Sequence, residues 1–172
     1  MRRKQKGFSL IELLIVVAII LIIAAMAIPN LLRARIAANE SSAVNSIRAI
    51  NTAEISYQTA FPQVGYAANL GNLGGPAPCT PSVTSGCLLD NTLTTASPGN
   101  GSKSGYVFLA TGLQPVNGVN TLYTAGGSPV TFNQSGVRNF CSNEDGVIRF
   151  NPGSSGSTPV NNTAACLAFT VL

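Results

Sequence analysis

The sequence contains no histidine and no tryptophan, and only 9% of its residues are charged. Typical soluble domains carry about 25% charged residues. Without histidine, Ser-His-Asp and Cys-His catalysis and metal sites built on imidazole are excluded. No other pairing of a nucleophile with a base stands out along the chain. We therefore expect a protein that is not an enzyme and that uses no cofactor and no metal.

The positive charge is concentrated at one end of the chain. The formal net charge is +4, and four of the ten Lys and Arg residues lie among the first six positions (Arg2, Arg3, Lys4 and Lys6). After residue 7, six cations face six acids, so the side-chain charge sums to 6 − 6 = 0. A chain without a broad basic surface is not predicted to bind nucleic acid. Arg138 and Arg149 lie on strand-like runs and are expected to be solvated strand positions.

Residues 8–28 are apolar except for Ser9 and Glu12. As a helix this segment would be about 31 Å long, close to the roughly 30 Å hydrocarbon core of a bilayer. Four cations precede it, whereas only Arg33 and Arg35 follow closely, which favours a cytoplasmic N-terminus. A secretory signal peptide cut after Ala25-Met26-Ala27 is one alternative, but its apolar region is usually about 7–15 residues long. An ordinary membrane anchor would leave Glu12 unexplained, because a lone carboxylate in an apolar helix costs several kcal/mol.

A third interpretation rests on one continuous string, Lys6-Gly7-Phe8-Ser9-Leu10-Ile11-Glu12-Leu13-Leu14. This string resembles the signature shared by type IV pilins and the pseudopilins of type II secretion. The resemblance covers about the first 60 residues. It implies cleavage of a leader (residues 1–7) between Gly7 and Phe8 by a prepilin peptidase, followed by N-methylation of Phe8. Glu12 becomes the fifth mature residue, and Pro29 takes the 22nd position, where many members have a helix-bending proline.

The resemblance also implies a function and a set of partners. Glu12 would pair with the new amine of Phe8 in a neighbouring subunit, so that sibling subunits polymerise into a type IV pilus with an assembly machine and its cytoplasmic ATPase. The precursor would sit in the bacterial inner membrane, and the filament would be extracellular, or periplasmic for a pseudopilus. A type II secretion pseudopilin or a minor pilin is one alternative. A secreted binding domain starting at Ile28 is another.

Residues 29–61 are predicted to continue the helix, because positions 30–60 contain neither glycine nor proline. Apolar residues repeat there at helical spacing, with Glu54 completing the pattern. The stripe consists of Ile36, Ala43, Val44, Ile47, Ile50, Ala53, Glu54, Tyr57 and Phe61. Polar residues are expected largely off this stripe: Arg35, Glu40, Ser41, Arg48 and Asn51. The pattern predicts a helix that packs its stripe against a globular head.

The head is predicted to span residues 62–172, where 16 of the 17 glycines and nine of the ten prolines lie. Residues 62–104 indicate a loop-rich region, and 105–150 an antiparallel sheet, which gives an α+β fold. The strand-like runs are 106–111, 120–125, 129–132, 137–141, 147–150 and 165–171. The turns expected between them include Gly126-Gly127, residues 133–136 and residues 143–146. Glu144-Asp145-Gly146 is more typical of a hairpin turn than of a calcium loop, because calcium requires six to eight oxygen ligands.

All four cysteines follow residue 78, which is compatible with two disulfides in an oxidising compartment. Three pairings are possible, and proximity along the chain favours Cys79 with Cys87 and Cys141 with Cys166. The second pair, with the C-terminal region 141–166 that it bounds, also resembles the C-terminal disulfide loop of many type IV pilins. A zinc site is disfavoured because these cysteines are accompanied by no histidine and no Cys-x-x-Cys motif.

Overall fold

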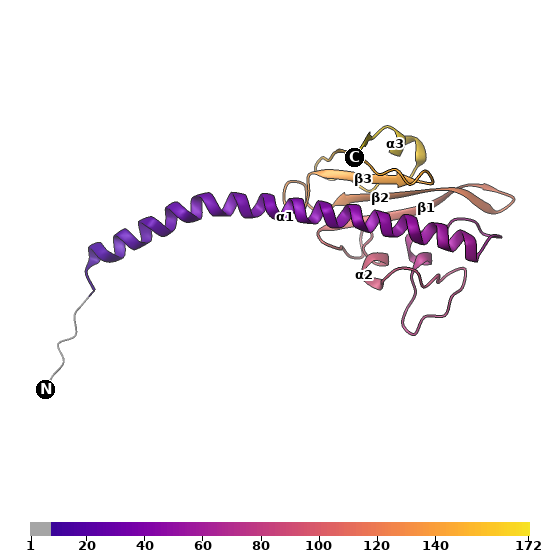
Figure 1. The fold of residues 1–172 in the computed structure, drawn as a ribbon, viewed down its shortest axis with the longest axis horizontal. Helices are drawn as coiled ribbons and strands as arrows, with labels where there is room; N and C mark the ends of the chain where they lie inside the picture. The colour runs from indigo at the N-terminus through magenta and orange to yellow at the C-terminus, as the bar shows by residue number, and fades with distance from the viewer. Residues whose placement is uncertain (1–7) are drawn as a thin grey trace. The chain divides into compact units, whose positions relative to one another are not determined.

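The computed structural model describes residues 8–172, so Gly7 and the rest of the expected leader lie outside the described residues. The chain divides into two compact units, the first ending at Arg35 and the second beginning at Ile36. Helix α1 (Leu10–Ala60) contributes to both units (Figure 1). Its long apolar sequence and freedom from glycine account for its length, and the one proline within it is Pro29.

In the first unit, the large apolar side chains of α1 are exposed; Leu21, for example, is 63% exposed. By length and composition, α1 would be able to cross a membrane. Helix α1 continues through Pro29 without a break. An apolar helix surface of this kind requires a lipid or protein environment, because exposed apolar area is unfavourable in water.

The head is built on one five-stranded antiparallel sheet in the simple order β1-β2-β3-β4-β5. The strands are β1 (Tyr106–Val116), β2 (Val119–Pro129), β3 (Arg138–Asn143), β4 (Arg149–Pro152) and β5 (Thr170–Val171). Three short helical segments complete the head: η1 (Leu70–Leu73), α2 (Asn91–Thr94) and α3 (Thr163–Leu167). The predicted α+β fold, with a long helix packed on a small antiparallel sheet, is confirmed.

The second half of α1 forms the core together with one face of the sheet. Ile47, Ile50 and Tyr57 are fully buried. They belong to one cluster with aromatic residues of β1, β2 and β3, namely Tyr106, Phe108, Tyr123 and Phe140. Seven of the nine residues of the expected apolar stripe are therefore buried, whereas Ile36 and Phe61 at its two ends are half-buried. Two residues expected off the stripe, Glu40 and Asn51, are buried as well, because each has a polar partner on the head.

The opposite face of the sheet carries α3 and the segment before it. Phe140 faces the core with α1, so the next residue, Cys141, faces the other side by strand alternation, where it bonds to Cys166 of α3. Gly126 lies on this second face, and a Cβ there would meet the backbone of Val160. The C-terminal segment consequently lies directly against β2.

The turn between β1 and β2 was not among the predicted turns, and three details of the predicted strands and turns are wrong. The β1–β2 turn is Asn117-Gly118, both with positive φ, which suits a two-residue hairpin. Gly126-Gly127 is not a turn but lies inside β2. Because glycine has no side chain, the Val160 backbone can lie close to Gly126 and the Phe108 ring close to Gly127. Residues 129–132 form no separate strand, because β2 ends at Pro129. The run 165–171 is only partly strand, since the Asn162 side chain caps α3 by accepting the Ala165 N–H at 2.8 Å.

Candidate assembly site

The first turn of α1 positions Glu12. Ser9 stands directly before the helix as its N-cap, and Glu12 is the third helical residue. The backbone N–H of Ser9 donates to Glu12 Oε2 at 2.9 Å. This is the reciprocal bond of a capping box, and a carboxylate in the first turn also interacts favourably with the helix dipole. The sequence reasoning missed this role, although the Ser-x-x-Glu spacing was present.

The surroundings of Glu12 are apolar and open. Phe8 is 75% exposed and Leu10 is 80% exposed. Within residues 8–172, no Lys or Arg lies within ion-pair distance of Glu12. The carboxylate therefore has one backbone partner, and a remaining oxygen able to accept a cation supplied from outside the described chain.

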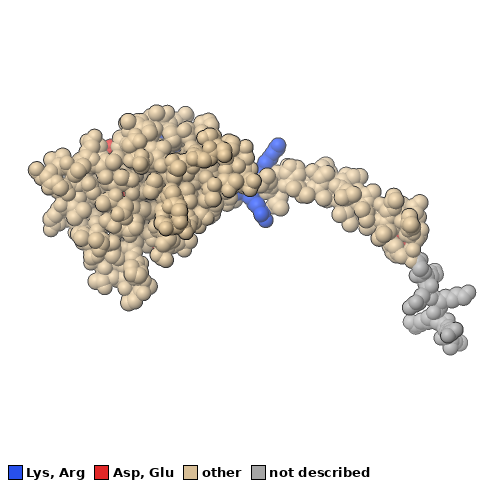
Figure 2. All heavy atoms as spheres, turned by 180° about the vertical axis from the view of Figure 1, so that it is seen from behind, with Lys and Arg blue, Asp and Glu red and all other residues tan. Residues whose placement is uncertain are grey.

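Pro29, Arg33 and Arg35 follow on the same helix. Pro29 has no N–H to donate to the carbonyl of Ala25, so one backbone hydrogen bond of α1 is missing there. Arg33 and Arg35 are both exposed. Figure 2 shows a face with few charged atoms, apart from blue side chains that project from the helix. Residues 10–35 of α1 thus present mainly apolar side chains, together with one acid and two cations.

In the head, Glu40 of α1 binds the start of β3. Its Oε1 accepts the N–H groups of Val137 and Arg138 at 3.0 and 3.1 Å. Its Oε2 lies 2.7 Å from a terminal nitrogen of Arg138, whose guanidinium also stacks over Phe140 and Phe150. The expectation that Arg138 is a solvated strand position is met only in part, because its side chain is 38% exposed but its guanidinium pairs with Glu40 at the helix–sheet contact.

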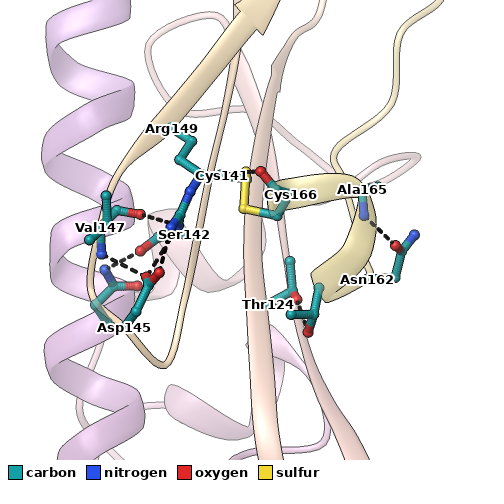
Figure 3. Close-up of a disulfide and its surroundings, with 11 residues drawn as sticks. Thr124, Cys141, Ser142, Asp145, Val147, Arg149, Asn162, Ala165 and Cys166 are labelled. Carbon is teal, nitrogen blue, oxygen red and sulfur yellow. Dashed lines mark hydrogen bonds and ion pairs between the residues drawn. A yellow bond between two sulfur atoms is a disulfide. The ribbon is translucent and has the colours of Figure 1, made fainter. Parts of the chain in front are cut away.

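Arg149 is likewise committed to a partner within the head. Its side chain is only 11% exposed and lies 2.5 Å from Asp145 Oδ2 (Figure 3). The hydrogen bond from Arg149 lowers the pKa of Asp145. Residues 143–146 form the expected turn between β3 and β4, with Gly146 N–H donating to the Asn143 carbonyl at 2.9 Å. In residues 8–172, no group of three or more His, Cys, Asp or Glu side chains is arranged to hold a metal ion.

Two disulfides are present, Cys79–Cys87 and Cys141–Cys166. Of the three pairings that the sequence leaves open, this is the one that joins each cysteine to the cysteine nearest to it along the chain. The Cys141–Cys166 bond is buried and joins β3 to α3 (Figure 3). The Cys79–Cys87 bond closes a loop whose Val83 carbonyl accepts the hydroxyl of Tyr57. Each disulfide thus ties an otherwise irregular segment to the head.

Parts of this chain are similar to known proteins. A family model described as the prokaryotic N-terminal methylation motif matches residues 2–28. The type IV major pilin protein PilA of Myxococcus xanthus is 39% identical over 79 residues, which cover 42% of this chain and 36% of that protein. Over the aligned residues, the chain is similar to a type IV major pilin. The type IV wide pilus major component PilA4 of Thermus thermophilus is 67% identical over 39 residues, covering 23% of this chain and 30% of that protein.

The aligned regions span about a third of the length of these curated pilins. No solved structure matches the chain. The type IV pilin family is structural rather than enzymatic, in line with the expectation from the sequence. The similarity to pilins therefore rests on the methylation motif at residues 2–28 and on the aligned parts of these two relatives.

Proposed function

We propose that this chain is a pilin subunit that polymerises into a type IV pilus. The observation that carries the proposal is the apolar, exposed first half of α1, with a single acid in its first turn and the methylation motif over residues 2–28. Exposed apolar area of this extent is favourable only in a bilayer or against other subunits. Both curated relatives are named as major pilus components, which favours a pilus over a pseudopilus.

The proposed life cycle assigns a role to each part of the chain. Residues 1–7 are a leader with a cytoplasmic N-terminus, 8–28 anchor the precursor in the inner membrane, and 29–61 join the anchor to the head of residues 62–172. Prepilin peptidase cuts between Gly7 and Phe8, and Phe8 is N-methylated. An assembly machine with a cytoplasmic ATPase then draws the subunit into the filament, where Pro29 loosens the helix locally.

The mature N-terminus tests the processing step. Intact mass and N-terminal sequencing of protein from the native host should give a chain that begins with N-methyl-Phe8. A mature chain that begins at Ile28 would instead indicate signal-peptidase cleavage and a secreted domain, and it would contradict the pilin proposal.

Glu12 is proposed to pair with the Phe8 amine of a neighbouring subunit. An apolar filament core makes an unpaired carboxylate costly, so the pair fixes how neighbouring subunits are aligned. Glu12→Ala should leave cleavage intact and abolish most filament assembly, measured as sheared pilin relative to total pilin.

Glu12 has two roles, since it caps the helix at Ser9 and is proposed to pair with the Phe8 amine. Glu12→Gln is the matched variant that distinguishes between them. A glutamine oxygen can still accept the Ser9 N–H, but it carries no charge. If pairing drives assembly, Glu12→Gln fails to assemble as Glu12→Ala does. Wild-type filament yield in Glu12→Gln would show that Glu12 acts only as a helix cap and would refute the pairing.

A further inference from the structure

Most charged side chains of the head are paired within the chain. Among the described residues, the ion pairs are Lys103–Asp90 at 3.4 Å, Arg138–Glu40 at 2.7 Å and Arg149–Asp145 at 2.5 Å. Glu54 is fully buried, and its Oε2 accepts the Ala67 N–H. Six of these ionisable groups are therefore in ion pairs and Glu54 is buried, so none of the seven is an unpaired surface charge.

The exposed charged side chains that form no ion pair lie in different parts of the chain. Two exposed acids make no ion pair within residues 8–172: Glu12 in the apolar half of α1, and Glu144 in the turn between β3 and β4 of the head. Three exposed cations, Arg33, Arg35 and Arg48, lie on α1 and also make no ion pair there. Arg48 donates a hydrogen bond to the Asn45 side chain at 3.3 Å, whereas the side chains of Arg33 and Arg35 donate no hydrogen bond among the described residues.

The turn that carries Glu144 is held in place on both sides. Asn143 accepts the Gly146 N–H, and the Asp145 carboxylate accepts the Val147 N–H at 2.9 Å in addition to its pair with Arg149. Gly146 has a φ of +69°, which glycine adopts without strain. Glu144 is therefore presented from a fixed turn, so a contact through it loses little chain entropy.

We propose that Glu144 of one subunit binds Arg33 or Arg35 of a second copy of this chain. The inference rests on the proposed polymerisation, since it assigns a contact between sibling subunits. Arginine and carboxylate form strong charge-assisted hydrogen bonds. Residues 33 and 35 are about 200° apart around a helix, so the two guanidiniums serve neighbours that approach from different sides. The scarcity of other free charges on the described surface leaves Glu144 few competing partners.

Crosslinking tests the contact directly. Glu144→Cys is combined with Arg33→Cys or Arg35→Cys, and assembled filaments are treated with a short bis-maleimide. The four native cysteines are bound in disulfides and should not react. At least one of the two combinations should give a ladder of crosslinked subunits. The matched control is Glu144→Cys with Arg48→Cys, which places a cysteine at an exposed helix arginine outside the proposed contact and should remain monomeric.

Charge reversal provides a second readout. Glu144→Arg should lower filament yield several-fold, and the triple variant with Arg33→Glu and Arg35→Glu should restore it. Intact disulfides in each variant would show that the head has folded. Normal filaments without a ladder at either arginine, or a ladder only with Arg48→Cys, would overturn this contact and leave the proposed function standing.

Two further outcomes are decisive. Reduced membrane retention of the Arg33→Glu and Arg35→Glu precursor, without any ladder in filaments, would assign the arginines to lipid headgroups and overturn the contact. If the wild-type chain forms no filaments, the proposed function itself fails.

Discussion

Glu54 occupies an apolar position on α1, and its carboxyl is fully buried. Oε2 accepts the Ala67 N–H at 2.8 Å, while Oε1 has no hydrogen-bond partner among the described residues. Burial disfavours the carboxylate form and raises the pKa of Glu54 from its ordinary value of 4.5 to about 7, against a smaller lowering by the Ala67 bond. The repeat along the helix correctly predicted that this position faces the core, but it gave no indication of the protonation state.

The raised pKa of Glu54 predicts that stability falls as pH increases. The unfolded chain ionises near pH 4.5 and the folded chain near pH 7, so ionisation penalises folding increasingly between these values and fully above them. The difference corresponds to about 3 kcal/mol. Full-length protein in detergent should therefore unfold at a lower temperature at pH 8 than at pH 5. Glu54→Gln, which keeps an acceptor for Ala67, should remove most of that difference; an unchanged pH dependence in this variant would contradict the assignment.

At the scale of elements, the contact of α1 with β3 depends on Glu40. Glu40→Ala would leave two backbone N–H groups and the Arg138 guanidinium without their acceptor. Because Arg138 is 38% exposed and partly solvated, we expect a loss of about 2 kcal/mol rather than the full cost of breaking a buried pair.

Thermal unfolding followed by near-UV circular dichroism would measure the Glu40→Ala effect. The control is Lys103→Ala, which breaks a more exposed pair with Asp90 and should change the midpoint little. Equal midpoints for the two variants would show that Glu40 does not fasten the helix to the sheet.

Element types were easier to predict than their boundaries. The long helix followed from residues 30–60, where neither glycine nor proline interrupts the apolar repeat. The glycines misled the reasoning at Gly126-Gly127, because a glycine needed for close packing looks the same in sequence as a glycine needed for a turn. Burial of Glu40 was equally inaccessible, since its partners at 137 and 138 are almost a hundred residues away.

At the scale of the whole molecule, the two disulfides should contribute unequally. Cys141–Cys166 is buried and closes a separation of 25 residues, whereas Cys79–Cys87 closes only 8. Replacing Cys141 and Cys166 by alanine should cost about 3 kcal/mol or more, and replacing Cys79 and Cys87 should cost less. Limited proteolysis should then cut the C-terminal segment of the first variant faster. Equal protection of that segment in both variants would argue against this ranking.

The candidate assembly site around Phe8 and Glu12 was easier to predict from the sequence than the contacts within the head. Phe8, Glu12 and the apolar run are contiguous in sequence, so their pattern is visible without tertiary contacts. Glu144, Arg33 and Arg35 became notable only after the structure had paired the other charges of the head, which composition alone cannot do.

The low charge of the head affects how strongly neighbouring filaments would repel one another in solution. If the heads form the outer surface, two neighbouring filaments meet mainly through hydroxyl, amide and glycine backbone groups. Charged surfaces repel over about one Debye length, and that repulsion weakens as salt is added. A nearly neutral surface lacks this barrier at any salt concentration. Lateral bundling of such filaments should therefore depend little on ionic strength and be governed by short-range hydration.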